Sequence, residues 1–297
     1  LVDLIVENRG AISNHTEIAA IDLEKKCVMD TQGQAYYYRR LIWAADQQTF
    51  YRLLDTKKTT DRNSRNAIFE KQRLLSTKSG NDSVYTMFLG SNLDVDYFAK
   101  KCTAHFFYTP SRTGQSSAGP VPVDQDRETI QKWLHQFFKL TTYEISIPVM
   151  RDSTMAPSGK TGLIISVLFD FKLTKSIEEQ GWYDSFKGYC EKTMLGVLNT
   201  AVFPGIEDSI QHVFSSTPLT LEKHTGNHEG AITGWAFTNR PIPAESRLPK
   251  VMNAIKTPIP GIYQAGQWTY SPSGLPISIL TGKIAADRVI KDLKKRA

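Results

Sequence analysis

The segment from Thr257 to Ala297 combines a short apolar strand, a glycine turn and a helix. The strand is expected over Gly261 to Ala265, and the turn follows at Gly266-Gln267-Trp268. We expect the helix to begin at Pro276 and to run to the C-terminus, because proline suits the first helical turn, where its missing N–H costs nothing. The segment therefore predicts a strand, a tight turn and a helix packed as one unit.

This arrangement is suited to binding an electron-rich group. The first N–H groups of a helix have no partner within the helix, and the helix dipole points its positive end at them. Gly282, Ala285 and Ala286 fall at i, i+3 and i+4, and predict a smooth helix face for a sheet or a flat ligand. The same pattern also fits an ordinary strand and helix that close a domain without any ligand.

Composition narrows the class of protein. Of the 297 residues 40% are hydrophobic and 22% are charged, which is typical of a soluble globular protein. The longest strongly apolar run, Gly162 to Phe171, is too short to cross a bilayer. The net charge of +6 is scattered rather than arranged as a dense basic stripe, which argues against nucleic-acid binding. We expect a cytoplasmic location, with peripheral contact to an anionic membrane as the alternative.

Candidate reactive groups are few. The three cysteines, Cys27, Cys102 and Cys190, are widely spaced and predict buried thiols in a reducing compartment. His224 and His228 stand four apart beside Glu229, but no third well-spaced ligand accompanies them, so no metal site is predicted. No nucleophile motif occurs, and the sequence identifies no catalytic acid or base.

Leu1, Leu4 and Ile5 have helical spacing, and Gly10 is placed to cap that helix. We expect the sequence to begin inside a helix and to be a fragment of a longer protein.

The rest of the chain alternates strands and helices. The polar stretch 46–83 predicts helices, and 112–126 predicts a loop rich in Pro and Gly. A capping box at Ser176 and Glu179 predicts the start of one long helix that ends at Pro204-Gly205. Other helices are expected over 65–75 and 129–140, and strands over 16–23, 27–30, 36–45, 83–89, 105–109, 143–149, 161–169 and 210–215. The apolar face of 129–140 is interpreted as core, with membrane docking as the alternative.

The closing segment resembles the C-terminal flavin-binding motif of the phytoene desaturase and carotenoid isomerase family of FAD-dependent oxidoreductases. The matching positions are Pro260-Gly261-Ile262-Tyr263, Ala265-Gly266, Trp268, Gly274, Leu275-Pro276, Gly282 and Ala285-Ala286. Three further stretches are similar to that family: the strand ending in Leu41 to Asp46, the turn from Asp152 to Lys160, and the segment Thr217 to Trp235.

The resemblance implies a fold. It is an α/β (α+β) two-domain FAD/NAD(P)-binding flavoprotein fold, with an inserted substrate domain of mixed sheet plus helices. The family's N-terminal Rossmann βαβ unit is missing, because this sequence holds no G-x-G-x-x-G. We expect residues 1–50 and 240–297 to form the partial FAD-binding domain and residues 51–239 to form the substrate-binding domain.

The resemblance also implies site residues. Those implied to contact FAD are Gly266, Gln267, Trp268, Gly274, Leu275, Pro276, Ile277 and Ala45, with Pro276 near the flavin's N1–C2=O edge. Gln267 stands where many related flavoproteins carry Asp or Glu, so the details of flavin binding are expected to differ. The residues implied to line the substrate pocket are Thr225, Asn227, Gly230 and Trp235.

The resemblance implies an enzyme that desaturates or isomerises a lipophilic, polyene-like substrate with FAD. FAD is expected in the full-length parent and not in this chain, which by itself is expected to be inactive. One alternative is a non-catalytic module that binds a lipophilic ligand or a partner. Another, within the same fold, is an amine-oxidase-like or protoporphyrinogen-oxidase-like flavoenzyme.

Overall fold

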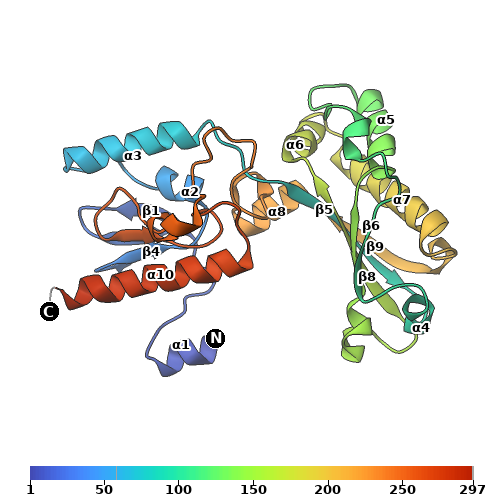
Figure 1. The fold of residues 1–297 in the computed structure, drawn as a ribbon, viewed down its shortest axis with the longest axis horizontal. Helices are drawn as coiled ribbons and strands as arrows, with labels where there is room; N and C mark the ends of the chain where they lie inside the picture. The colour runs from blue at the N-terminus through green and yellow to red at the C-terminus, as the bar shows by residue number, and fades with distance from the viewer. Residues whose placement is uncertain (58, 296–297) are drawn as a thin grey trace. The chain divides into compact units, whose positions relative to one another are not determined.

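A computed structural model describes residues 1–57 and 59–295, which form two compact units (Figure 1). The first unit comprises Leu1–Ser79 and Thr233–Ala297, and the second comprises Gly80–Ile232. Residues 51–79 and 233–239, which we assign from sequence to the substrate domain, thus lie in the first unit. The functional names of the domains stay predictions.

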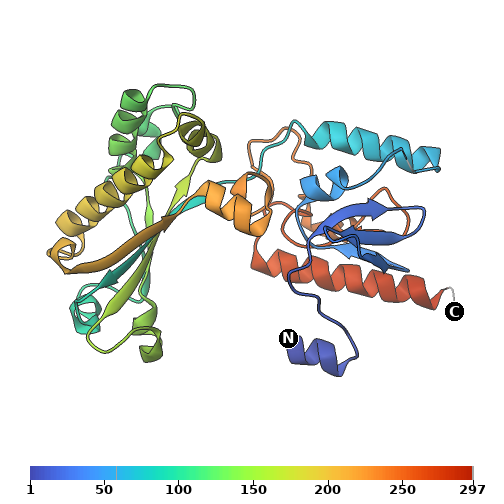
Figure 2. The same cartoon turned by 180° about the vertical axis from the view of Figure 1, so that it is seen from behind.

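The first unit holds two small sheets. Strands β1 (Ile18–Asp22), β2 (Cys27–Asp30) and β3 (Ala35–Tyr37) form an antiparallel sheet in that order (Figure 2). Strands β4 (Leu41–Trp43) and β10 (Ile262–Gln264) form a parallel pair. The single strand predicted over 36–45 is therefore wrong. Its first part pairs with β2 and its second with β10, and one straight strand cannot join both sheets.

Among the described residues of this unit, five α-helices and one 3-10 turn accompany the sheets. They are α1 (Val2–Glu7), α2 (Gln47–Arg52), α3 (Arg62–Leu75), the 3-10 turn Leu248–Lys250, α9 (Val251–Ala254) and α10 (Leu275–Lys294). The helix expected at the N-terminus is present. Arg9 takes the left-handed conformation after it, and the Gly10 N–H donates to the Ile5 carbonyl at 2.8 Å. The predicted helical residues Arg296 and Ala297 lie outside the described part of the chain.

The second unit is built on a five-stranded sheet in the order β6-β7-β8-β5-β9. Every pairing in it is antiparallel, so the sheet is not mixed as expected. The longest strands, β5 and β8, pair along their full length. The bounds are β5 (Ser83–Ser91), β6 (His105–Tyr108), β7 (Tyr143–Ser146), β8 (Thr161–Phe169) and β9 (Ile210–Ser216).

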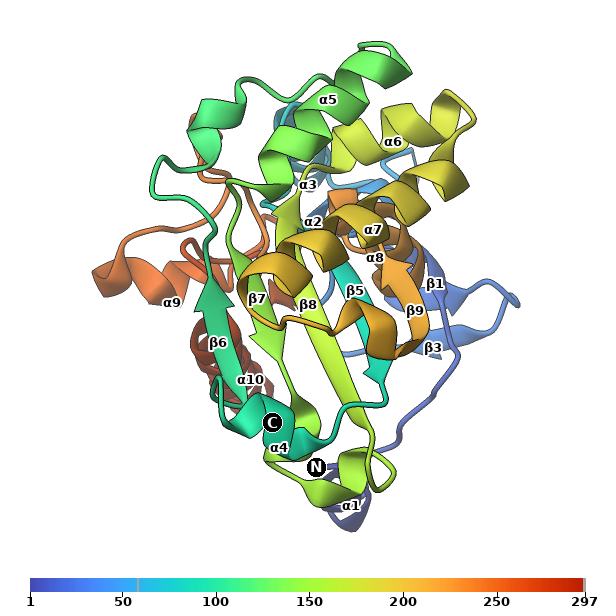
Figure 3. The same ribbon diagram turned by 90° about the vertical axis from the view of Figure 1, so that its right-hand side faces the viewer.

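Helices cover one face of this sheet (Figure 3). The helices of the unit are α4 (Val95–Ala99), α5 (Arg127–Phe138), α6 (Phe171–Glu179), α7 (Tyr183–Ala201) and α8 (Pro218–Thr225), with 3-10 turns at Gln115–Ala118, Pro148–Met150, Ser153–Met155, Glu207–Ser209 and His228–Gly230. On α5 the apolar side chains Ile130, Leu134, Phe137 and Phe138 are buried in the core. The core interpretation of this helix is confirmed.

The capping box predicted at Ser176 is wrong. Ser176 lies inside α6, which is capped by Asp170 accepting from the Leu173 N–H at 2.7 Å. Gly181, at φ +78°, then separates α6 from α7. Two helices therefore replace the single long helix, because apolar spacing continues across a glycine that the backbone uses to turn.

All three cysteines are free thiols. Cys27 and Cys190 are buried, as predicted, whereas Cys102 is half-buried. Burial raises the pKa of the Cys190 thiol well above its ordinary value. Within the described residues no cluster of three or more His, Cys, Asp and Glu side chains could hold a metal ion. In the same residues no helix is long and apolar enough to cross a membrane.

Candidate functional site

The candidate site lies where the parallel strands β4 and β10 end. The Ala265 N–H donates to the Trp43 carbonyl at 2.9 Å, which extends the pairing by one step beyond the strands. Gly266 then turns the chain at φ +89°. A Cβ at this position would lie 3.3 Å from the Ala44 carbonyl oxygen, so both backbone shape and space favour glycine. Ala44 and Ala45, at the end of β4, are exposed.

Thr281 fastens the turn to α10. Its hydroxyl accepts from the Gly266 N–H at 3.0 Å and donates to the Ile277 carbonyl at 2.9 Å. The side chain is fully buried. On the other side of the turn, Thr269 donates through its hydroxyl to the Gly266 carbonyl at 2.8 Å. The turn is thus held through both backbone groups of one glycine.

The first turn of α10 carries no side-chain cap. Gly274 occupies the N-cap position, and the helix begins at Leu275, one residue before the predicted start at Pro276. Leu275 is 75% exposed. The N-terminal end of the dipole therefore faces outward beside the glycine turn, with small or apolar groups around it.

The face that α10 buries differs from the predicted one. Thr281, Ile284 and Ala285 are buried, whereas Gly282 is half-buried and Ala286 is exposed. Ile284 and Ala285 pack against Tyr263 and Ala265 of the β10 segment. The expected smooth face of glycine and alanine is therefore only partly correct.

A second tie joins α10 to β10. The Tyr263 hydroxyl donates to the Asp292 carboxylate, and Arg288 Nε lies 3.2 Å from the other oxygen of that carboxylate. The Tyr263 hydrogen bond, followed by the charges of Arg288 and Arg40, lowers the pKa of Asp292. Thr281 and Asp292 stand about three helical turns apart, so the helix is fixed to the strand at both ends of this stretch.

Trp235 and Trp268, predicted respectively to line the substrate pocket and to contact FAD, meet in the first unit. Their rings lie 4.9 Å apart, edge to face, and Trp235 Nε1 donates to the Trp268 carbonyl at 3.0 Å. Gly234, at φ +74°, allows this approach, because a Cβ there would lie only 2.4 Å from the Gln267 carbonyl oxygen. Both indoles are buried, so they support the turn from within.

The other three predicted pocket residues lie in the second unit, and the structure does not bring them together with Trp235 in one unit. Thr225 is exposed, and its hydroxyl donates to the Leu221 carbonyl at 2.7 Å. Asn227 donates its backbone N–H to that hydroxyl at 3.2 Å. Gly230, at φ +58°, packs so closely that a Cβ would lie 2.4 Å from the Pro218 carbonyl oxygen.

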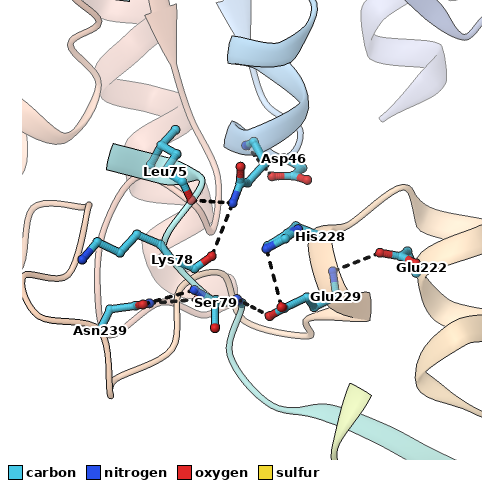
Figure 4. A network of polar contacts seen from close by, with 10 residues as sticks. Asp46, Leu75, Lys78, Ser79, Glu222, His228, Glu229 and Asn239 are labelled. Atoms are coloured by element: carbon cyan, nitrogen blue, oxygen red, sulfur yellow. Dashed lines mark hydrogen bonds and ion pairs between the residues drawn. The ribbon is translucent and has the colours of Figure 1, made fainter. Parts of the chain in front are cut away.

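Polar contacts pin the segments at which the chain passes from one unit to the other (Figure 4). In the second unit, Glu229 accepts from the Gly80 N–H at 2.8 Å and lies beside His228, with Nε2 and Oε1 3.9 Å apart. In the first unit, Asn239 accepts from the Ser79 N–H at 3.1 Å and donates to the Ser79 carbonyl at 2.8 Å. Glu229 and His228 thus belong to this network, whereas His224 is exposed on α8.

A buried amide pair lies beneath the candidate site. Gln47 Nε2 donates to Gln264 Oε1 at 2.6 Å, and Gln264 Nε2 donates to the Ala254 carbonyl at 2.8 Å. Among the described residues Gln47 Oε1 finds no hydrogen-bond partner. Sequence reasoning missed this pair, although a glutamine inside an otherwise apolar strand is a detectable signal.

The second unit leaves one face of its sheet free of the helical core. Tyr85, Met87 and Leu89 of β5 point into the core, so Val84, Thr86 and Phe88 occupy the opposite face. Cross-strand neighbours continue that face: Leu168 opposite Val84, Ile164 and Phe214 opposite Phe88. Phe88 and Phe214 stack at 4.7 Å. Thr86 and Ser166 satisfy each other at 2.9 Å, which leaves a largely apolar surface.

Comparison with known proteins places this geometry in context. No family model matches the chain. Over 151 residues it is 28% identical to 4,4'-diapophytoene desaturase (4,4'-diaponeurosporene-forming) of Staphylococcus aureus strain Newman. The match covers 51% of this chain and 29% of that relative. Over about half of its length, this chain is therefore similar in sequence to a diapophytoene desaturase.

Two solved structures show the same fold. An oxidoreductase from Methanosarcina mazei matches 98% of this chain and 52% of its own, with a TM-score of 0.55 and 13% identity. The A394C mutant of putrescine oxidase, from a redesign of cofactor binding, matches 93% of this chain and 48% of its own, with a TM-score of 0.51 and 11% identity. The predicted α/β fold is therefore confirmed.

Proposed function

We propose that this chain is the C-terminal portion of an FAD-dependent oxidoreductase that desaturates or isomerises a lipophilic, polyene-like substrate. The observation that carries the proposal is the Gly266 turn at the carboxyl end of the β4–β10 pair, which leads to the uncapped N-terminus of α10. In a phytoene desaturase-like chain, this is where an electron-rich ring would be held.

The residues at this edge fit the flavin end of FAD. Exposed Ala45 offers little steric bulk at the end of β4, and exposed Leu275 and Pro276 offer an apolar surface at the start of α10. When bound, FAD would supply the hydride chemistry. The protein's part would be to place the ring and to stabilise negative charge on it through the first N–H groups and the dipole of α10. In the proposal Gly266, Gln267, Gly274 and Ile277 complete the contact, with the Gln267 amide as a neutral hydrogen-bonding group.

Trp268 and Trp235 take a different part in the proposal. Both are buried, and Trp235 Nε1 donates to the Trp268 carbonyl, so in the proposal they hold the turn in shape rather than touch the ring. Within these 297 residues no glycine-rich loop is present to grip a pyrophosphate. We therefore place only the flavin-facing half of the site in this chain, and propose that the chain alone does not retain FAD.

The sheet face of the second unit that the helical core leaves uncovered supports the proposal of a lipophilic substrate. Phe88, Ile164 and Phe214 form a row across three strands, and the hydroxyls beside them pair with each other. A strand of nine residues extends for about 30 Å, so an extended apolar chain has room along this face. Thr225, Asn227 and Gly230, in the same unit, remain proposed pocket residues. No titratable group is assigned a catalytic role, since direct hydride transfer requires few.

The experiment is a flavin-retention assay. The 297-residue chain and a longer product of the same gene, extended upstream, are each mixed with FAD, passed through gel filtration and read by flavin absorbance. We expect bound flavin only in the longer product. Stoichiometric flavin in the short chain would contradict the half-site, and no flavin in the longer product would favour a non-catalytic lipophilic-ligand or partner-binding module.

Matched glycine variants test the site itself in the longer product. Gly266→Ala should lower flavin retention, whereas Gly33→Ala, at a similar φ of +83° but with open space around it, should not. Equal retention in both would refute the assignment of this turn. Incubation with a partly saturated polyene then distinguishes the reactions, because desaturation lengthens the conjugated system and shifts its absorbance, whereas isomerisation leaves the number of double bonds unchanged.

A further inference from the structure

A groove in the second unit is lined by residues of α5, of α7 and of the segment at the end of β6. Figure 3 shows α5 and α7 on the helical side of the sheet. We call this groove the α5–α7 groove. Its volume is about 590 Å³, within the range of pockets for small molecules. It is lined by Tyr108, Pro110, His135, Lys139, Tyr189, Lys192, Thr193, Gly196, Val197, Thr200 and Ala201. None of these residues belongs to the proposed flavin site or to the free sheet face.

Gly196 keeps the floor of the groove open. It lies inside the 19-residue helix α7, where glycine is less favourable than alanine. A Cβ at Gly196 would meet no atom within 4 Å, so packing within the chain does not require glycine there. Together with Val197 and Ala201 it gives the groove a low, apolar floor.

The lining carries only positive charge. Lys139, Lys192 and His135 contribute basic groups, and no carboxylate lines the groove. In the residues that the structure describes, none of these three side chains takes part in an ion pair. The lining therefore suits a ligand with an apolar body and an anionic end.

We propose that the α5–α7 groove binds a single-chain anionic amphiphile of the fatty-acid type. Its hydrocarbon chain lies over Gly196, Val197 and Ala201, and its carboxylate lies between the ammonium groups of Lys139 and Lys192. Tyr108 and Tyr189 border the ligand's hydrocarbon chain, and each offers an aromatic face and a polar hydroxyl end. This proposal is independent of the flavin site.

Calorimetry with the full 297-residue chain tests the proposal. The probes are dodecanoate and dodecyl maltoside, which share a twelve-carbon chain but differ in charge. We expect dodecanoate to bind and Gly196→Leu to weaken it at least about tenfold, because the new side chain fills the floor. Gly188→Leu is the matched control. Gly188 lies on the same helix, also has open space around it and does not line the groove. The affinity of the Gly188→Leu variant for dodecanoate should therefore equal that of the parent chain.

The charge is tested by Lys139→Gln combined with Lys192→Gln. The affinity for dodecanoate should fall about tenfold in this double variant. The affinity for dodecyl maltoside should be the same in the double variant and in the parent chain. Circular dichroism checks that each variant is folded. Equal dodecanoate affinity in Gly196→Leu and Gly188→Leu would overturn the proposal. A second result would also overturn it: no binding of dodecanoate, together with binding to anionic phospholipid vesicles that Gly196→Leu does not weaken. The positive charge would then serve contact with a membrane surface.

Discussion

Replacing Gly234, which is not itself a proposed ligand contact, by alanine should disturb the candidate site. Two effects add at this position. The backbone has φ +74°, where a side chain costs about 1–2 kcal/mol. The new Cβ would also lie 2.4 Å from the Gln267 carbonyl oxygen, whereas ordinary contact begins at 3.4 Å, so about 1 Å of movement is required.

That movement has to come from backbone, since the Gln267 carbonyl carbon is also only 3.1 Å away. Overpacking of this kind costs about 1–3 kcal/mol. The sum is about 2–5 kcal/mol. Shifting the turn also strains the Trp235–Trp268 hydrogen bond, so the loss should spread to the turn that contains Gly266.

Gly33→Ala supplies the control, because Gly33 lies in the same unit at φ +83° with no atom within 4 Å of an added Cβ. It should cost only the backbone part, about 1–2 kcal/mol. Hydrogen exchange read by mass spectrometry on peptides of β10 and α10 measures the first unit separately. Protection should fall about 5- to 150-fold further in Gly234→Ala than in Gly33→Ala, which corresponds to the overpacking cost of about 1–3 kcal/mol. Equal protection in the two variants would refute the close-approach argument.

Three further outcomes follow from single contacts. Thr281→Val should cost about 1–3 kcal/mol in urea unfolding, because the Gly266 N–H loses its buried acceptor, while Thr281→Ser should retain most of the stability; equal losses would contradict this role. Because the folded-state pKa of Asp292 is lowered, its stabilising contribution is present above the ordinary Asp value near 4 and is lost as pH falls through the folded pKa. Between pH 7 and about pH 3, the free energy of unfolding should therefore fall less in Asp292→Asn than in the parent chain. An identical pH profile in the two proteins would count against a stabilising role for the Tyr263–Asp292 hydrogen bond. Iodoacetamide should leave Cys190 unmodified in the folded chain and modify it in urea, as peptide mass spectrometry can check; rapid native modification would be incompatible with its burial and raised pKa.

The sequence predicted the closing strand, turn and helix well, because each has a local signal. Glycine at 266 permits the positive φ of the turn, and proline at 276 restricts φ at the start of the helix, whatever surrounds them. The strand over 36–45 was less predictable. Its β propensity is continuous, and only the identity of the pairing partners, one of them more than 200 residues away, divides it into β3 and β4.

The candidate site needed the structure for a similar reason. Thr281 is an unremarkable helix residue in sequence, and its role depends on Gly266 meeting it in space. Trp235 follows Thr225 and Asn227 closely in sequence, yet the boundary after Ile232 puts it in the other unit. Ser176 had the right local pattern for a cap, but Asp170 capped an earlier helix start. Contacts distant in sequence decided the first two cases, and a competing local cap decided the third.

The chain enters and leaves the second unit at neighbouring points. The Ile232 N–H donates to the Asp82 carbonyl at 3.2 Å, and on the other side of the boundary the Ala236 N–H donates to the Ser79 carbonyl at 3.1 Å. Because the two ends of the inserted unit are adjacent, the unit can be replaced or removed at a low entropic cost. A short connection is then enough to join Ser79 to Thr233 in the first unit. Residues 80–232 therefore form a natural cassette. A lineage could replace or reshape it, and with it the free sheet face and the α5–α7 groove, while leaving the Gly266 turn unaltered.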